Sequence, residues 1–193
     1  DNVGDVAGMG SDLFESYVGS IISAITLAVV IPSVNPMFGQ PFMLDPFTGS
    51  VFPLILSAVG ILASIVGILV VKGDEKSNPA KALNMGTYLS AVLVVIVSFI
   101  LSKQFFGNIN AAVAVVAGLI VGTAIGKITE VYTSDEYKHV KKIAEQSQTG
   151  AATTIIGGLG VGMLSTVYPM LIISVGILVS NAAAGLYGIA LAA

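Results

Sequence analysis

The sequence predicts an all-α protein, a polytopic transmembrane helix bundle with about five complete spans and a truncated sixth, forming a single domain over 1-193. Composition carries this prediction: 55% of the residues are hydrophobic and only 10% are charged, and the mean hydropathy is +0.94. Soluble domains usually carry about 25% charged residues. A soluble fold of 193 residues has too little interior for so much apolar surface, so most of that surface is expected to face lipid.

Hydropathy divides the chain into six apolar stretches separated by proline-rich, glycine-rich or charged loops. The stretches run roughly over 1-31, 52-71, 87-102, 111-133, 151-180 and 182-193. Four prolines between 32 and 46 end the first helix. The fifth stretch is too long for one straight crossing, so we expect it to be tilted, kinked or partly outside the lipid. Because the chain starts at a charged residue other than Met and ends inside the sixth stretch, we expect an internal piece of a longer protein.

The lysines predict the orientation of these spans. If successive spans alternate in direction, the loops 72-86 and 134-150 lie on the same side as the start of the chain. That side carries Lys72, Lys76, Lys81, Lys138, Lys141 and Lys142, with Lys127 nearby, whereas only Lys103 lies opposite. An excess of lysine marks the cytoplasmic side. The sequence therefore predicts a multi-pass membrane protein with Asp1 and Asp5 near the cytoplasmic face.

Several function classes find no support in the sequence. The chain has no cysteine, which excludes disulfides, thiolate catalysis and cysteine metal sites. All eight basic residues are lysines and no basic run suggests nucleic acid. No serine, histidine and acid arrangement and no glycine-rich phosphate loop is visible. His139 lies among lysines and is expected to be exposed rather than catalytic.

The first fifteen residues, DNVGDVAGMGSDLFE, carry four acids at the start of an apolar segment. At 100° per residue, Asp1, Asp5, Asp12 and Glu15 fall within roughly 80° of one another, as a stripe about 21 Å long. We call these four residues the acidic stripe. Acids in a membrane helix are costly, so they indicate a functional site.

The two ends of the acidic stripe suggest different chemistry. Asp1 and Asp5 lie one turn apart, which suits a hard cation such as Mg²⁺ that also binds substrate phosphates; the alternative is that these acids only complement the helix dipole. Asp12 and Glu15 form an i, i+3 pair of like charge. Such a pair shares a proton, binds a cation or meets a lysine of another helix, and it indicates a cation or proton gate unless it is a static ion pair.

Glu130, in the run GKITEVYTSDEY, is the next isolated acid. The predicted orientation puts Glu130 on the same side as Asp1 and Asp5, so it is a candidate for a further Mg²⁺ ligand. Two simpler alternatives stay open: a solvated helix end, or a pair with Lys127.

Several motifs together resemble the membrane-integral pyrophosphatases, ion pumps driven by pyrophosphate hydrolysis. DNVGDVAGMGSDLFESY is similar to the signature of that family, and EVYTS at 130-134 resembles a family run in which Val131 is a tyrosine. TGAATTII at 149-156 and AGLYGIALAA at 184-193 also resemble family segments, in the expected order. The resemblance therefore extends over the whole chain.

The resemblance implies a role for each acidic residue. Asp1 would bind the Mg²⁺ ions that hold pyrophosphate, Asp5 would share in that Mg²⁺ site and help to orient and deprotonate the attacking water, and Glu130 would be a further Mg²⁺ candidate. Asp12 would lie in the ion gate and Glu15 would be the gate carboxylate. In plant-type proton pumps the glutamate lies one turn deeper, where this chain has Gly19, so Glu15 suggests the other branches, which pump Na⁺ or H⁺.

The resemblance also implies the partners: pyrophosphate, Mg²⁺, K⁺ as a candidate activator, Na⁺ or H⁺ moved outward, the lipid bilayer and a second copy in a homodimer. Hydrolysis would take place on the cytoplasmic side. The family's upstream lysine-containing stretch and its later helices are absent here, so this piece alone is expected to be inactive. The alternative is a secondary transporter coupled to Na⁺ or H⁺ without hydrolysis; a purely structural subunit leaves the acidic stripe unexplained.

Overall fold

The computed structural model describes residues 2-37, 41-71 and 79-193, and it confirms the all-α prediction. The elements are α1 (Asn2–Val30), β1 (Ser33–Val34), β2 (Phe42–Met43), α2 (Pro46–Val70), α3 (Pro79–Phe106), α4 (Asn110–Thr133), α5 (Lys138–Ser147) and α6 (Ala151–Ala192). Within the described residues, five helices are long and apolar enough to cross a membrane. The two strands form one short antiparallel pair.

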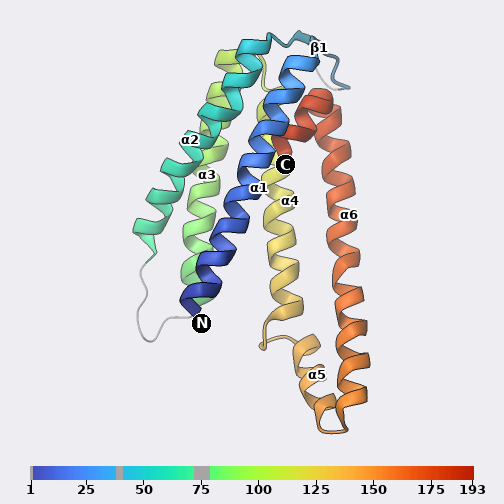
Figure 1. The fold of residues 1–193 in the computed structure, drawn as a ribbon. Coiled ribbons are helices and arrows are strands. Elements are labelled where there is room, and N and C mark those ends of the chain that lie inside the picture. The colour runs from blue at the N-terminus through green and yellow to red at the C-terminus, as the bar shows by residue number, and fades with distance from the viewer. Residues whose placement is uncertain (1, 38–40, 72–78) are drawn as a thin grey trace.

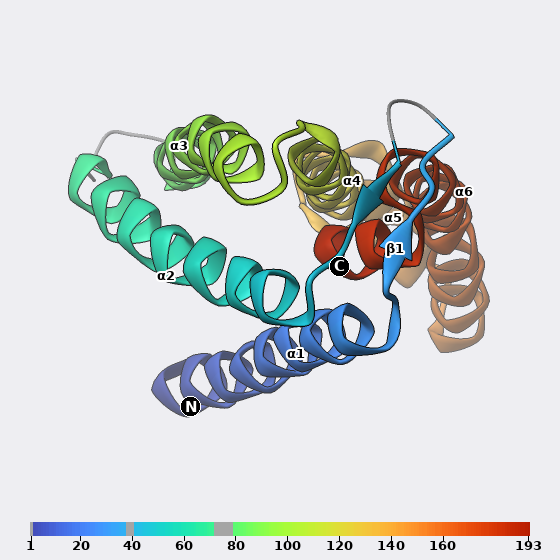
Figure 2. The same ribbon diagram turned by 90° about the horizontal axis from the view of Figure 1, so that it is seen from above.

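The long helices run up and down side by side (Figure 1). The start of α1, the end of α2, the start of α3 and the end of α4 point toward the same end of the bundle, which we call the site end. Seen from above, α2, α3 and α4 follow one another in an arc, α6 lies beside α4, and α1 lies along the side of α2 that faces away from α3 (Figure 2). The most extensive contacts join α4 to α6 and α2 to α3.

The core lies at the opposite end, beneath the β1–β2 pair. Its centre is a cluster of four buried residues, Ala28 of α1, Val34 of β1, Tyr187 of α6 and Leu44 of the segment between β2 and α2. An aromatic group extends this cluster, with Phe106 in ring contact with Phe42, Phe52 and Tyr187. The C-terminal half of α1 is therefore anchored, because Ala28 belongs to the cluster and Ala24 is buried as well.

A buried hydrogen bond compensates for a proline inside α2. Pro53 has no backbone N–H, so the carbonyl of Gly49, four residues earlier, loses its usual helical donor. The hydroxyl of Tyr187 donates to that carbonyl over 2.7 Å. Gly49 also has to be a glycine, because a Cβ there would lie 2.8 Å from the Cβ of Ala28. This contact joins the start of α2 to the last part of α6.

The helices differ from the apolar stretches of the sequence in three places. α2 begins before its stretch, because Asp45 caps it by accepting a hydrogen bond of 3.0 Å from the Thr48 N–H. Residues 138-147 of the charged segment form the helix α5. α6 continues past residue 181 and breaks at Ala184 and Gly185, where Gly185 has φ of 59°. The last residues then fold back, so that Ala192 packs against Gly118 (Figure 1).

Candidate functional site

The acidic stripe lies on the exposed half of α1. Asp5, Asp12 and Glu15 are all exposed on this helix, whereas Asp1 lies outside the described residues. The two glycines nearest to Asp5, Gly4 and Gly8, have nothing within 4 Å of the position that a Cβ would occupy. The structure therefore holds these acids on one straight helix and leaves the space beside them open.

Within the described residues, the three acids have no basic partner. No ion pair joins a lysine or histidine to Asp5, Asp12 or Glu15 in that part of the chain. The like charges of Asp12 and Glu15 are therefore not relieved by a lysine of the helices described here. The three alternatives that the sequence offers for Asp12 and Glu15, namely a shared proton, a bound cation or a lysine of another helix, therefore stay predictions.

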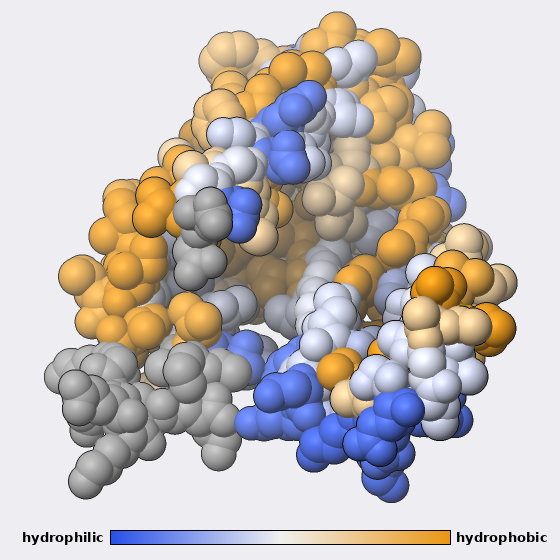
Figure 3. Space-filling model, turned by 60° about the horizontal axis from the view of Figure 1, so that its bottom comes forward, coloured by the Kyte–Doolittle hydropathy of each residue, from blue (hydrophilic) through white to orange (hydrophobic). Residues whose placement is uncertain are grey.

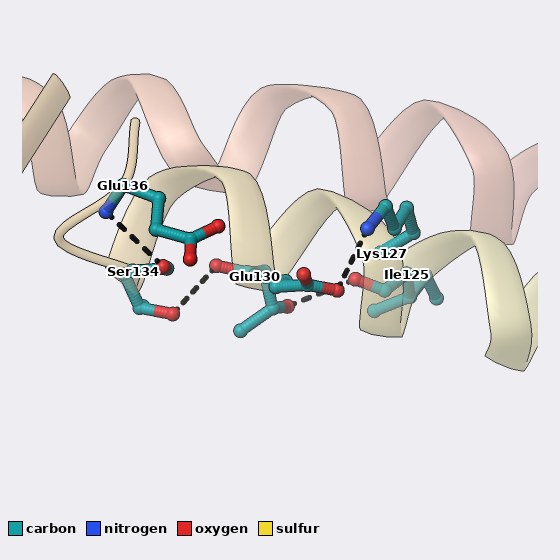
Figure 4. A network of polar contacts seen from close by, with 7 residues as sticks. Ile125, Lys127, Glu130, Ser134 and Glu136 are labelled. Carbon is teal, nitrogen blue, oxygen red and sulfur yellow. Dashed lines mark hydrogen bonds and ion pairs between the residues drawn. The ribbon is translucent and has the colours of Figure 1, made fainter. Parts of the chain in front are cut away.

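Glu130 lies near the end of α4 in a small network of polar contacts (Figure 4). Its Oε2 accepts a hydrogen bond of 2.9 Å from Nζ of Lys127, three residues earlier, and its backbone carbonyl accepts the N–H of Ser134 over 2.9 Å. The pairing with Lys127 is the simpler alternative that the sequence offered. To bind a metal ion through Oε2, Glu130 would have to release Lys127.

Among the described residues, the acids of α1 and Glu130 are not gathered into one cluster. The start of α1 and the end of α4 lie at the site end (Figure 1), so Asp5 and Glu130 share that end. However, among the described residues no group of three or more Asp, Glu or His side chains could hold a metal ion. At this end Asp5 is an exposed carboxylate with no ion pair within the described residues, so a metal site here would need further ligands from outside them.

A groove beside the acidic stripe was not foreseen from the sequence. It has a volume of about 780 Å³ and lies between α1, α2 and α3, and Figure 3 shows the molecule hollowed at this end. Its walls are apolar apart from a set of hydroxyl groups: Ser16, Tyr17, Ser20, Ser57, Ser64, Thr87 and Ser90. The hydroxyl of Ser90 bridges two helices, since it donates to the carbonyl of Ala63 over 3.0 Å. Ser16 and Ser20 lie four residues apart and so share one face of α1, and this spacing is the sequence signal for a hydroxyl-bearing wall.

The segment after α4 also forms a contact that the sequence did not predict. The ring of His139 stacks on that of Tyr132, with centroids 4.4 Å apart and an interplanar angle of 27°. His139 is therefore partly covered by a neighbouring ring instead of fully exposed.

Comparisons with known proteins agree with the motifs. The family described as "Inorganic H+ pyrophosphatase" matches residues 1–193. Two similar proteins are named "Putative K(+)-stimulated pyrophosphate-energized sodium pump": one from Clostridium tetani is 55% identical over the whole chain, and one from Bacteroides thetaiotaomicron is 42% identical over the whole chain. A "K(+)-insensitive pyrophosphate-energized proton pump 2" from Moorella thermoacetica is 39% identical over 92% of the chain. The chain spans 29%, 28% and 25% of these three relatives, respectively.

Proposed function

From the premise that this chain belongs to the inorganic H⁺ pyrophosphatase family, we propose that the protein containing it hydrolyses Mg²⁺-bound pyrophosphate and uses that reaction to move a cation across the membrane. The observation that carries the proposal is the acidic stripe on an exposed helix face, within a chain that matches the family over its full length. The family match favours this function over a secondary transporter without hydrolysis.

We assign the start of the acidic stripe to hydrolysis. Asp5 is exposed and unpaired within the described residues, so its carboxylate is available to bind a cation or to orient and deprotonate water. Asp1, one turn earlier in sequence, and Glu130, at the same end of the bundle, are the proposed further Mg²⁺ ligands. Mg²⁺ would neutralise the charge of the substrate and of the phosphate that leaves. The lysine bias of the loops puts this end at the cytoplasmic face.

The deeper part of the stripe is assigned to transport. Asp12 and Glu15 lie about 10–15 Å from Asp5 along the axis at 1.5 Å per residue. Both groups of acids lie on one helix, so a displacement of α1 would change the hydrolytic site and the gate together. The anchored C-terminal half of α1 leaves its exposed half as the part free to shift.

The comparisons favour Na⁺ as the transported ion. The relatives that are 55% and 42% identical carry the name of a sodium pump, and those named as proton pumps are 39% identical or less. The same two names mention K⁺ stimulation, so we assign K⁺ as the activator. We also propose that the protein forms a homodimer, as the resemblance to the family implies.

The test uses the full-length protein in vesicles supplied with Mg²⁺, K⁺ and pyrophosphate. We expect phosphate release and uptake of ²²Na⁺ that a protonophore does not abolish. Asp5→Asn should abolish both activities, whereas Glu15→Ala should abolish Na⁺ uptake. Asp135→Asn, which changes an exposed acid in the turn after α4, is the matched control and should keep both. Absence of phosphate release would refute the enzyme proposal, and unchanged uptake in Glu15→Ala would refute the gate.

A further inference from the structure

A second pocket lies between α5 and α6, away from the acidic stripe. It has a volume of about 480 Å³. Its wall on α5 consists of Lys138, His139, Lys142 and Gln146, and its wall on α6 consists of Ile156, Gly157, Gly160, Val161 and Leu164. The two helices meet closely, because the amide of Gln146 leaves no room for a Cβ at Gly157. We call this the α5–α6 pocket.

The charge in the α5–α6 pocket is positive and uncompensated. Lys138 and Lys142 lie one helical turn apart on the same wall, and no carboxylate lines the pocket. Three acids do belong to the same segment, Asp135, Glu136 and Glu145, but within the described residues the one ion pair is that of Lys127 with Glu130. Two ammonium groups without a carboxylate partner favour an anion as the ligand.

The other wall of the pocket is apolar and open. Leu164 is 48% exposed and Ile156 is 72% exposed, and the neighbouring turns of α6 expose Leu159 and Met163 as well. An inorganic phosphate ion would gain nothing from this wall, whereas an amphiphilic anion would cover it. Figure 3 shows the same juxtaposition, with hydrophilic surface gathered at the end where α5 lies and hydrophobic surface beside it.

The level of the α5–α6 pocket along the bundle follows from the packing of α4 on α6. Val121 of α4 packs against Gly176 of α6, and these two helices run in opposite directions (Figure 1). Thr133, at the end of α4, is therefore level with Leu164, and Ile156 lies about 12 Å farther out at 1.5 Å per residue. The 24 residues of α4 span about 36 Å, slightly more than the roughly 30 Å hydrocarbon core. With α4 placed across the bilayer from end to end, the pocket would begin where the headgroup layer begins.

We propose that the α5–α6 pocket binds an anionic phospholipid, with Lys138 and Lys142 on the phosphate of the headgroup and the apolar wall of α6 against the start of its acyl chains. Basic pockets between helices at a membrane surface recognise such headgroups. Lysine stems also cover apolar surface while the charged ends reach the headgroup. The site does not depend on pyrophosphate hydrolysis and lies outside the residues assigned to it.

Native mass spectrometry of the full-length protein tests the proposal. The protein is titrated in detergent with dioleoylphosphatidylglycerol, and with dioleoylphosphatidylcholine as the uncharged comparison. At about 1 kcal/mol for each lysine near an anionic surface, the double variant K138Q/K142Q should bind one phosphatidylglycerol about 30-fold more weakly. Lys141 lies on the same helix but does not line the pocket, so K141Q is the matched control and should bind like the wild type.

The other results of this titration either support or overturn the lipid assignment. Equal loss of phosphatidylglycerol in K141Q and in K138Q/K142Q would overturn it, as would binding of phosphatidylcholine with the same affinity. Displacement of the lipid by millimolar inorganic phosphate would identify a free-phosphate site and overturn the lipid assignment. The variant K138R/K142R keeps both charges and should keep the lipid, and its failure to do so would contradict recognition by charge.

Discussion

The hydrogen bond from Tyr187 to the carbonyl of Gly49 gives a prediction in which two distant residues should be coupled. The bond measures 2.7 Å and is buried, and it replaces the donor that Pro53 lacks. Replacing Tyr187 by phenylalanine removes the hydroxyl and keeps the ring in its aromatic contact with Phe106. The Gly49 carbonyl would then have no donor, because Pro53 cannot supply one.

The expected magnitude follows from the burial of this carbonyl. Leaving a buried acceptor unsatisfied costs about 1–3 kcal/mol, and hydrogen bonds inside membrane proteins contribute roughly 0.6 kcal/mol on average and at most about 1.7. We therefore expect Tyr187→Phe to lower the free energy of unfolding by about 1–1.5 kcal/mol. In a Pro53→Ala background the new Ala N–H can donate to Gly49, so the same change should cost less than about 0.5 kcal/mol.

The assay is a double-mutant cycle on the full-length protein, with the free energy of unfolding measured by titrating sodium dodecyl sulfate into mixed micelles. The cycle isolates the coupling even though Pro53→Ala also changes packing. Tyr132→Phe, at the other end of the bundle, removes a hydroxyl of a tyrosine outside the core and controls for the substitution itself. Equal costs of Tyr187→Phe with Pro53 and with Ala at 53 would refute the compensation argument.

Three further predictions concern stability. Hydrogen bonds from the Thr48 backbone N–H and, next in importance, from its hydroxyl hold the pKa of Asp45 below its ordinary value of 3.8. The stabilisation by the ionised Asp45 is therefore fully present above pH 3.8 and is lost as the pH falls through the lower pKa of the folded state. Asp45→Asn should make the free energy of unfolding depend less on pH below about pH 4. Gly49→Ala places a Cβ 2.8 Å from that of Ala28 and should cost about 1–3 kcal/mol, whereas Gly60→Ala on the same helix, which meets nothing within 4 Å, should cost nothing. Gly185→Ala forces a side chain to φ of 59° and should cost about 1–2 kcal/mol of unfolding free energy, and a value near zero would mean that the break in α6 lies elsewhere.

The fold class could be predicted because helices that face lipid need long uninterrupted apolar stretches, which are a strong signal in the sequence. Helix boundaries could not, because local capping sets them. Asp45 and Pro46 begin α2 within sequence that reads as loop, and α3 includes Pro79, eight residues before its apolar stretch. α5 was missed because it is short and amphipathic, so that its lysines and glutamate make the segment read as a charged loop in a search for apolar stretches. The break in α6 was missed because residues 182-193 stay apolar through it, and only the left-handed backbone of Gly185 marks the turn.

The candidate site was predictable to the extent that one helix determines it. The 100° periodicity puts Asp5, Asp12 and Glu15 on one face, and the structure has all three on α1 without a break. The pairing of Glu130 was also among the stated alternatives, since i, i+3 neighbours meet on any helix. The hydroxyl-lined groove needed the relative positions of three helices, which no spacing along the sequence gives.

The packing of glycines separates the two halves of α1 and bears on how hydrolysis and transport would be coupled. Some glycines elsewhere in the bundle lie where helices approach closely, since Gly49 meets Ala28 of α1 and Gly67 meets Gly86, whereas others, such as Gly122 and Gly158, meet nothing within 4 Å. The glycines of the acidic half, Gly4, Gly8, Gly10 and Gly19, meet nothing within 4 Å. Small residues next to acids on an open face let a ligand or another backbone come close to the helix. A helix fixed at one end by the core and open at the acidic end is the geometry that a shared displacement of the proposed Mg²⁺ site and the proposed ion gate would require.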